Sequence, residues 1–387
     1  MMNLGFRMMA PPFIFFGNGV SKQIGPILKT QMGVDSATIF CDPYIRTSGL
    51  LSGIEASLKG FGVSYTIYSE IDSNPTHSSI MKAAKFLKEN KSNIVIAVGG
   101  GSSIDAAKLA RAMTVAPPPI SQYVDVEGAV KAFPMPQVSI PTTAGTGAEV
   151  TAGGVVADDE THIKGIVSGA GLMSQAAFCD PELTISLPPA LTASTGMDAL
   201  THAIEGVSSQ ARNPVADIYH FEAIRLIAAN LRTAYADGKD KNARYNMMLG
   251  AMLAGIAMHG SSCGAAHGFA YPLESRENWT HGDANAAILP AVMRHNAPAV
   301  APIYRKVAEA MGENVCGLSD REAAFRAVAA VEQLCRDVKI PRLKDRGITE
   351  DDVEDLAMTV MTLSRALGNN TTFVTPEDAE MIYRTSL

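Results

Sequence analysis

The sequence predicts an α/β domain with a mostly parallel sheet, followed by an all-helical domain. Short β-branched runs alternate with amphipathic helical stretches up to about residue 187, and this alternation is typical of an α/β fold. After Leu187-Pro188-Pro189 the β-branched runs stop and helical periodicity replaces them. The chain has 387 residues, which exceeds the length at which a single hydrophobic core usually stops growing. We therefore expect two domains, 1–187 and 188–387.

Three segments support the α/β assignment of the first domain. SATIFCD (36–42) and NIVIAVGGG (93–101) are short apolar runs that end in turns, as buried parallel strands do. SSIMKAAKFLKEN (78–90) carries apolar residues at helical spacing. Strands that alternate with such helices build a parallel sheet.

The second half has the composition and periodicity of helices throughout. The expected helical segments are 190–209, 213–235, 243–259, 284–298, 301–312 and 320–338.

Composition and charge exclude several classes of protein. Hydrophobic residues make up 47% and charged residues 18%, which is typical of a globular enzyme. The net charge of −7 and the scattered Lys and Arg residues argue against nucleic acid as a partner. The N-terminal stretch has no signal-peptide apolar region and no membrane span, so we expect a cytoplasmic protein with no membrane partner. The widely spaced cysteines, with no CxxC pair, are expected to be reduced: Cys41, Cys179, Cys263, Cys316 and Cys335.

A glycine-rich turn joins the strand at 93–101 to a helix. Gly99, Gly100, Gly101 and Ser102 let the backbone turn sharply and let a ligand approach the amides. The helix that follows directs unpaired N–H groups and a positive dipole end at an anion, so a diphosphate fits there. The same turn also occurs in α/β proteins that bind no nucleotide, because it matches neither GxGxxG nor a P-loop.

Two further features favour a dinucleotide. PTTAGTG (141–147) places Thr142, Thr143 and Thr146 with two glycines after a strand, and hydroxyls can bond a ribose or a phosphate. Asp42 ends the strand at 36–42, where a carboxylate can accept from ribose hydroxyls and repel a 2′-phosphate. The alternative for Asp42 is a cap or turn residue before Pro43. We therefore predict NAD rather than NADP.

A metal site is predicted in the second half. Asp198 and His202 are four residues apart, so they project from one helix face and can converge on one ion. The alternative is a buried carboxylate that is hydrogen-bonded to the imidazole. His267 and His281, each followed by Gly, supply two more nitrogens. One oxygen and three nitrogens suit Fe²⁺, Zn²⁺ or Mn²⁺.

The motifs GGGSSIDAAK, PTTAGTGAEVT, TGMDALTHAIEG, AAHGFAYPL and HGDANA occur in this order and at these separations over essentially the whole chain. In this the sequence resembles the iron-dependent (group III) alcohol dehydrogenase family. The resemblance implies an N-terminal dinucleotide-binding domain, a C-terminal helical domain, a bound metal and a homo-oligomer, most simply a dimer. It places the metal ligands on Asp198, His202, His267 and His281. The cofactor pattern falls on Asp42, Asn74, Gly99 to Ser102, Asp105, Thr142, Thr143, Thr146 and Lys164.

The resemblance also implies the chemistry. A divalent cation polarises an alcohol or aldehyde oxygen, and the nicotinamide gives or takes the hydride. We expect an NAD-dependent oxidoreductase that acts on a small primary alcohol or aldehyde.

Several residues depart from the family pattern. Tyr271 stands where many members carry a histidine, and its phenol, with an ordinary pKa of about 10, is a poor general base. His259 precedes the third ligand and is either a catalytic group or a helix-face histidine. Gly153-Gly154 and the run Glu274-Ser275-Arg276 suggest a roomier, more polar pocket. We hypothesise a substrate with a second polar or anionic group and Arg276 as its partner.

Three alternatives remain open from the sequence. The domain plan is shared with dehydroquinate synthase-like enzymes, which use NAD transiently but have a different ligand set and a more basic pocket. A metal-free enzyme similar to maleylacetate reductase would have no use for all four ligands. The chain could also be a catalytically silent sensor that binds NAD and an ion.

Overall fold

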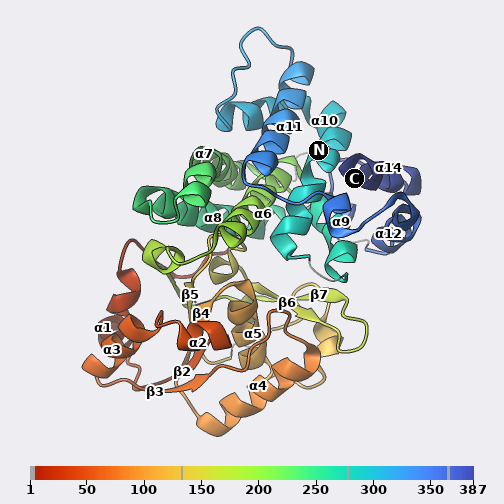
Figure 1. Cartoon of the computed structure of the whole chain (residues 1–387). Coiled ribbons are helices and arrows are strands. Elements are labelled where there is room, and N and C mark those ends of the chain that lie inside the picture. Colours follow the sequence, from red (N-terminus) through yellow and green to blue (C-terminus); the bar gives the residue numbers. More distant parts are fainter. Residues whose placement is uncertain (1–4, 132–133, 277–278, 364–366) are drawn as a thin grey trace. The chain divides into compact units, whose positions relative to one another are not determined.

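The computed structural model describes residues 5–131, 134–276, 279–363 and 367–387. The chain divides into two compact units, whose elements are labelled in Figure 1. The N-terminal unit comprises residues 9–143 and 147–185. The C-terminal unit comprises residues 144–146 and 186–387, together with the described part of 1–8.

The N-terminal unit is built around a six-stranded sheet in the order β1-β8-β5-β4-β2-β3, and every neighbouring pair is parallel. Its strands, with those of a separate hairpin, are β1 (Phe13–Phe16), β2 (Ser36–Phe40), β3 (Ser64–Tyr68), β4 (Ile94–Gly99), β5 (Gln137–Pro141), β6 (Gly153–Ala157), β7 (Lys164–Ser168) and β8 (Ala176–Cys179). Its helices are α1 (Ile24–Pro26), α2 (Pro43–Thr47), α3 (Ser52–Gly60), α4 (His77–Asn90) and α5 (Gly101–Ala112). The segments predicted at 36–42, 78–90 and 93–101 are β2, α4 and β4, so the predicted α/β fold is confirmed.

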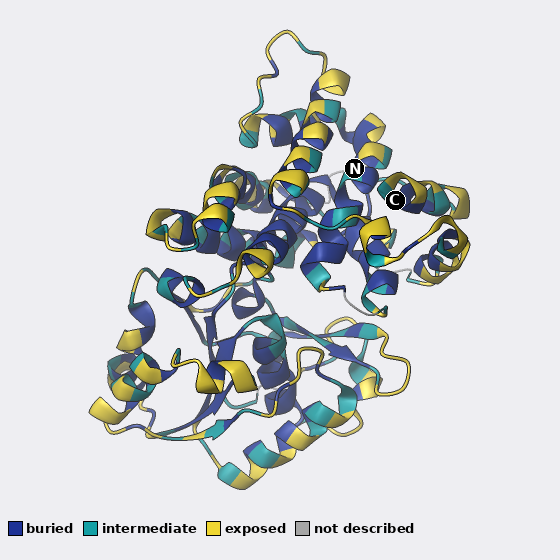
Figure 2. Cartoon of the chain, viewed as in Figure 1, coloured by how far each residue is buried: buried dark blue, intermediate teal, exposed yellow. Residues whose placement is uncertain are grey.

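Both faces of the sheet are covered. Val95 and Ala97 of β4 belong to a core that includes residues of α4 and α5, whereas Ile94 and Ile96 belong to a core with residues of α1 and α3. The alternation follows from the two-residue period of a strand. Burial on both faces explains why β4 is continuously apolar, and Figure 2 shows the centre of the sheet in the colour of buried residues.

The antiparallel pair β6 and β7 forms a second, two-stranded sheet that the sequence had not predicted. Gly154 lies in β6, and a Cβ there would come within 3.0 Å of Leu109 Cγ on α5. The small residue at this position therefore has a packing reason within the N-terminal unit, in place of the wider substrate pocket expected from the sequence.

Among the described residues of the C-terminal unit, the regular secondary structure is helical. Its helices are α6 (Pro189–Ser208), α7 (Pro214–Ala236), α8 (Lys241–Ser261), α9 (Ala265–Glu274), α10 (His281–Ala310), α11 (Asp320–Asp337), α12 (Val353–Met361) and α14 (Pro376–Ser386). The six predicted helical segments lie in α6, α7, α8, α10 and α11. Two of them, 284–298 and 301–312, form the single helix α10, which kinks at Val300 between Pro298 and Pro302 because proline cannot complete the helical hydrogen bonds.

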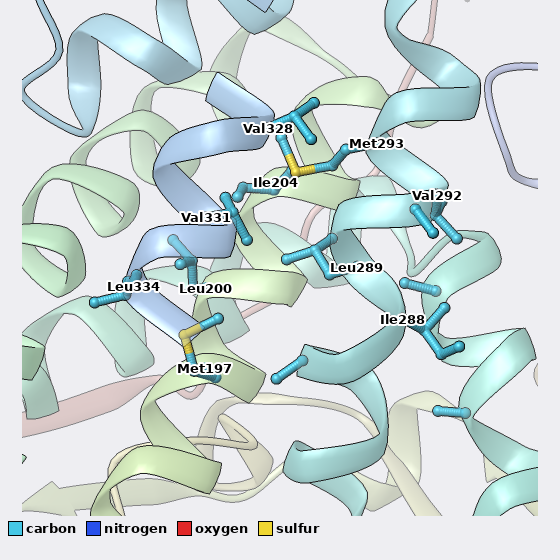
Figure 3. Packing of buried hydrophobic residues seen from close by; sticks show 14 of the residues in the cluster. Met197, Leu200, Ile204, Ile288, Leu289, Val292, Met293, Val328, Val331 and Leu334 are labelled. Atoms are coloured by element: carbon cyan, nitrogen blue, oxygen red, sulfur yellow. The ribbon is translucent and has the colours of Figure 1, made fainter. Parts of the chain in front are cut away.

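Helix α6 is buried along most of its length at the centre of this unit. Met197, Leu200 and Ile204 of α6 belong to one core with Leu289 of α10 and Val331 of α11, as Figure 3 shows. The polar residues of α6 are therefore buried too. A buried polar group that lacks a hydrogen-bond partner lowers the stability of the fold, so each of these residues needs a partner.

Two expectations about the chain as a whole can be compared with the structure. All five cysteines are free, as predicted. Within the described ranges, no helix is long and apolar enough to cross a membrane.

Candidate functional site

Three helices of the C-terminal unit bring the predicted metal ligands together. Asp198 and His202 lie one turn apart on α6, His267 lies in the first turn of α9, and His281 is the first residue of α10. One ligand atom from each of the four side chains lies within 4.8 Å of the others.

The spacing of these atoms fits a shared cation. Oδ1 of Asp198 lies 3.9 Å from Nε2 of His202, 3.8 Å from Nε2 of His267 and 3.6 Å from Nε2 of His281. All three separations are too long for a hydrogen bond. Two ligands about 2.1 Å from one tetrahedral ion lie roughly 3.4 Å apart, close to these values. The alternative of a directly hydrogen-bonded Asp198–His202 pair is therefore not what the structure shows.

The contacts of His267 favour the tautomer that a metal ligand requires. Its Nδ1 lies 2.5 Å from Oε2 of Glu205, and a carboxylate can only accept, so Nδ1 carries the proton and donates. In the neutral ring the lone pair is then on Nε2, which is buried and has no hydrogen-bond partner among the described residues. A buried acceptor without a partner is unusual, and a cation at this point would satisfy it. The residues present therefore fit a divalent metal.

His281 is arranged in the same way. Its Nδ1 lies 2.6 Å from Oε1 of Glu274 and donates to it. Its Nε2 accepts from the Nδ2 amide of Asn285 at 3.2 Å, and the same amide donates to Oδ1 of Asp198 at 2.9 Å. The Asn285 amide therefore donates to two candidate ligand atoms, Oδ1 of Asp198 and Nε2 of His281.

Charge favours the ionised carboxylates at this site. Burial by itself would raise the pKa of Asp198, but His202, His281 and His267 outweigh it and the pKa is lowered. Burial opposes ionisation of Glu205 as well, yet His267 and two backbone N–H groups hold the pKa of Glu205 below its usual value. Both acids are therefore present as anions beside the imidazoles.

Local sequence explains how the helices come so close. Thr280 caps α10 by accepting from the Asp283 N–H at 3.3 Å, which fixes His281 as the first helical residue. Gly282 follows, and a Cβ there would lie 2.1 Å from the carbonyl oxygen of Ser194 on α6. Only glycine allows α10 to start in contact with α6 at this point.

Three further residues singled out in the sequence belong to the C-terminal unit. The ring of Tyr271 stacks at 6.3 Å from that of His281. Cys263 lies within 4.8 Å of Glu205 and His267; burial would raise the pKa of its thiol, but the neighbouring His267 and His202 lower it to about 6. His259 is near the end of α8, and burial lowers the pKa of its imidazole, which favours the neutral form.

Arg276 does not match the role hypothesised for it. Its guanidinium is paired with Asp352 at 2.6 Å and with Asp355 at 3.4 Å, so it connects the end of α9 to α12 and to the residues just before it. An arginine already neutralised by two carboxylates is a poor partner for a second anionic group on a substrate, and we withdraw that assignment.

The candidate nucleotide residues gather at the carboxyl ends of three neighbouring strands. β2 ends before Asp42, β4 ends at Gly99, and β5 ends before Thr142, whose N–H donates to the Gly99 carbonyl at 3.0 Å. The chain order also reverses between β2 and β4, because β3 lies on one side and β5 on the other. In open parallel sheets this reversal point is where nucleotides bind.

Close packing accounts for two of the glycines at this edge. Gly99 has a φ of 151°, and a Cβ there would lie 2.5 Å from Ser103 Oγ. Gly100 precedes α5 as its N-cap, and a Cβ there would lie 3.5 Å from Thr143 Cγ2. The first turn of α5 follows directly, and the unpaired N–H groups of a helix start are the kind of group that binds an anion.

The remaining cofactor candidates are more dispersed. Ser102 donates to the Ser73 carbonyl, next to the exposed Asn74. Asp105 Oδ2 accepts from the Val155 N–H at 3.0 Å, which gives this acid a structural role between α5 and β6. Lys164 begins β7, whereas Thr146 belongs to the C-terminal unit.

The sequence reasoning missed three residues that contact the candidate ligands. Asn285 is four residues after His281 and Glu205 is three after His202, so helical spacing could have indicated both. Glu274 was noted only as a polar change, because seven residues and a helix boundary separate it from His281.

Comparison with known proteins identifies the family. Residues 11–181 match the iron-containing alcohol dehydrogenase family, and residues 192–387 match the C-terminal part of the Fe-containing alcohol dehydrogenase family. The chain is 35% identical to long-chain-alcohol dehydrogenase 1 of Geobacillus thermodenitrificans over 380 residues. The aligned region covers 97% of this chain and 95% of the relative. It is 35% identical over 386 residues to lactaldehyde reductase of Escherichia coli K12, covering 98% and 99%.

A solved structure agrees with these relatives. The sulfoacetaldehyde reductase of Bifidobacterium kashiwanohense, determined in complex with NAD⁺, superimposes with a TM-score of 0.88 at 28% identity, covering 99% of each chain. The fold and the site define an NAD-dependent oxidoreductase of alcohols and aldehydes. The chain belongs to the iron-containing alcohol dehydrogenase family, so the predicted family and class of enzyme are confirmed, and the dehydroquinate synthase-like alternative is not supported.

Proposed function

We propose that this chain transfers hydride between NAD(H) and a small primary alcohol or aldehyde, with Asp198, His202, His267 and His281 as the ligands of one divalent cation. The convergence of these four side chains, with an unpartnered, buried Nε2 on His267, is the observation that carries the proposal. When bound, Fe²⁺, or Zn²⁺ or Mn²⁺ in its place, supplies Lewis-acid polarisation of the substrate oxygen.

The N-terminal unit is assigned to the dinucleotide. The turn Gly99–Ser102 and the start of α5 would receive the diphosphate, with Thr142 and Thr143 as hydroxyl donors. Thr146, which belongs to the C-terminal unit, stays in the predicted cofactor set. Asp42 is assigned to the adenosine ribose, which favours NAD over NADP. Asn74, Asp105 and Lys164 stay in the predicted cofactor set. The predicted domains, 1–187 for the dinucleotide and 188–387 for metal and substrate, follow the same division of roles.

The protein's own residues orient the reactants and move the proton. Tyr271 stacks on His281 and is the candidate to donate a hydrogen bond to the substrate. His259 remains a second candidate for proton transfer, and its lowered pKa keeps it able to accept one at neutral pH. When bound, NAD would supply the hydride chemistry at the carbinol carbon, and Tyr271 and His259 are the candidates to pass on the hydroxyl proton.

A polar-substituted substrate is the finer part of the proposal. The lactaldehyde and sulfoacetaldehyde named in two relatives carry a second polar group, whereas the long-chain alcohols named in another do not. Kinetics on a hydroxyaldehyde and on the unsubstituted aldehyde of the same chain length decide this point. Equal kcat/KM for the pair would remove the polar group from the proposal.

The test of the proposed function begins with metal-free protein. Reconstitution with Fe²⁺, Zn²⁺ or Mn²⁺ should restore NADH oxidation with a panel of short aldehydes, and His267→Ala should neither retain metal nor turn over. Metal and NADH binding without turnover on any aldehyde would instead support the sensor alternative. Absence of metal binding would contradict the ligand assignment itself.

A homodimer and a cytoplasmic location complete the proposal. β1 is an edge strand of the six-stranded sheet and exposes Phe13, and an apolar edge strand favours pairing with another copy. Light scattering on the purified protein would show a mass of two chains.

A further inference from the structure

We infer that Glu205 and Glu274 are positioning residues, which hold His267 and His281 in the tautomer and orientation that a metal ligand needs. The inference rests on the proposed metal site and extends it to two carboxylates outside the ligand set. They act on the two histidines that come from α9 and α10, the helices that are separate from α6.

Glu205 connects α6 to the start of α9. Its two carboxylate oxygens are both used: Oε2 accepts from Nδ1 of His267 and Oε1 accepts from the Ala266 N–H, each at 2.5 Å. A Cβ on Gly264 would lie 3.1 Å from Oε1, so the N-terminus of α9 is packed directly on this acid. One side chain therefore fixes the first turn of α9 and the ring of His267 together.

Glu274 connects the end of α9 to the start of α10. It is the last residue of α9, its side chain is 1% exposed, and Oε1 lies 2.6 Å from Nδ1 of His281. The side chain of His281 is 31% exposed, against 3% for Asp198, 5% for His202 and 4% for His267. His281 is therefore the most exposed of the four candidate ligands. The bond to Glu274, together with the Asn285 amide and the ring of Tyr271, therefore helps to hold a partly exposed ring in place.

The chemistry requires a group that only accepts. A neutral imidazole has one N–H and one lone pair, and a carboxylate opposite Nδ1 forces the proton onto Nδ1 and the lone pair onto Nε2. All three imidazoles present Nε2 to Oδ1 of Asp198, so this tautomer is the useful one. A carboxamide could instead donate to Nδ1 and leave the proton on Nε2, where it would block binding. Outer partners of this kind typically change metal affinity 10- to 100-fold.

The experiment uses the full chain with the conservative variants Glu205→Gln and Glu274→Gln, and with Glu309→Gln as the matched control. Glu309 is an exposed acid near the end of α10. The readouts are the Co²⁺ dissociation constant of metal-free protein, by competition with a chelator, and the visible absorption bands of the Co²⁺ complex. The thermal midpoint of each metal-free variant shows whether it is folded.

We expect each site variant to weaken Co²⁺ binding by about 10- to 100-fold and to alter the absorption bands, while Glu309→Gln matches the parent in both. Glu274→Asp, which keeps a carboxylate, should bind Co²⁺ more tightly than Glu274→Gln. Folded variants with the parent's affinity and spectrum would overturn the inference and leave the metal site intact. If the parent chain itself binds no Co²⁺, Fe²⁺ or Zn²⁺, the proposed function fails and the inference fails with it.

Discussion

Oδ1 of Asp42 accepts a hydrogen bond from the Ile45 N–H at 2.8 Å and so caps the first turn of α2. Its other oxygen, Oδ2, would lie 3.6 Å from a Cβ on Gly99, beside the glycine-rich turn. Both interpretations given by the sequence are therefore compatible: one oxygen caps the helix, and the other is available near the proposed nucleotide.

Asp42→Ser separates these two roles, because serine can cap a helix but carries no charge. We expect the preference for NADH over NADPH in kcat/KM to fall by about tenfold, which corresponds to 1.4 kcal/mol. The thermal midpoint should stay near that of the parent. An unchanged preference would show that Asp42 serves only as a cap.

Asp198→Asn removes the charge shared by the three histidines and keeps the shape of the side chain. Because Oδ1 of Asp198 faces all three Nε2 atoms, we expect metal affinity to fall by more than about 100-fold, beyond the usual effect of losing an outer partner. Metal content after dialysis and NADH oxidation measure the loss. Asp320→Asn, at an exposed acid that begins α11, is the control and should retain full metal content.

Gly282→Ala tests the close contact between α10 and α6. A methyl group would lie 2.1 Å from the Ser194 carbonyl, so the first turn of α10 must move and take His281 with it. We expect the free energy of unfolding to drop by about 1–3 kcal/mol and metal affinity to drop as well. Gly60→Ala is the control, because the space around Gly60 is open and no loss is expected. Normal metal binding by Gly282→Ala would show that the contact does not position His281.

His220 gives the C-terminal unit a dependence on pH. It is buried on α7, its Nε2 lies 2.8 Å from Ser261 Oγ, and burial, with His202 adding to it, lowers its pKa to about 3. The unfolded chain takes up this proton below its ordinary pKa of about 6.5, so stability is full above that value and is lost as pH falls toward 3. Between pH 7 and pH 5 this amounts to about 2 kcal/mol.

His220→Gln removes this titrating group. Denaturant unfolding at pH 7 and pH 5 should show that the variant loses about 2 kcal/mol less than the parent over this interval. Equal losses in the two proteins would mean that His220 is protonated in the folded state. Other titrating groups contribute the same change to both proteins and cancel in the comparison.

Periodicity predicted the elements of the fold that are continuous in sequence. The strands β2 and β4 follow from short continuous apolar runs, and the long helices α6, α7 and α11 follow from apolar residues at a spacing of 3.6 or from helix-forming composition. The hairpin β6–β7 was missed because its strands are five residues each and contain Gly153, Gly154 and Gly165. The two segments that merge into α10 were separated in the prediction by Pro298 and Pro302, which only kink the helix.

For the site, the identity of the four candidate ligands followed from local spacing and from the resemblance to a family. Which groups contact those ligands did not follow. Glu274 and His281 lie on different helices, and Arg276 was expected to face a substrate but is neutralised by Asp352 and Asp355. A side chain's partner depends on which helix faces it, and no local pattern contains that information.

By itself the sequence determined the fold class, the family, and the residue types able to hold a metal and a dinucleotide, because these depend on local periodicity and on motifs that are short and continuous. Tertiary structure alone decided that Oδ1 of Asp198 faces three Nε2 atoms and that Glu205 and Glu274 hold two of the rings. Proton position on an imidazole is set by what lies opposite each nitrogen, and that is settled only when the helices pack.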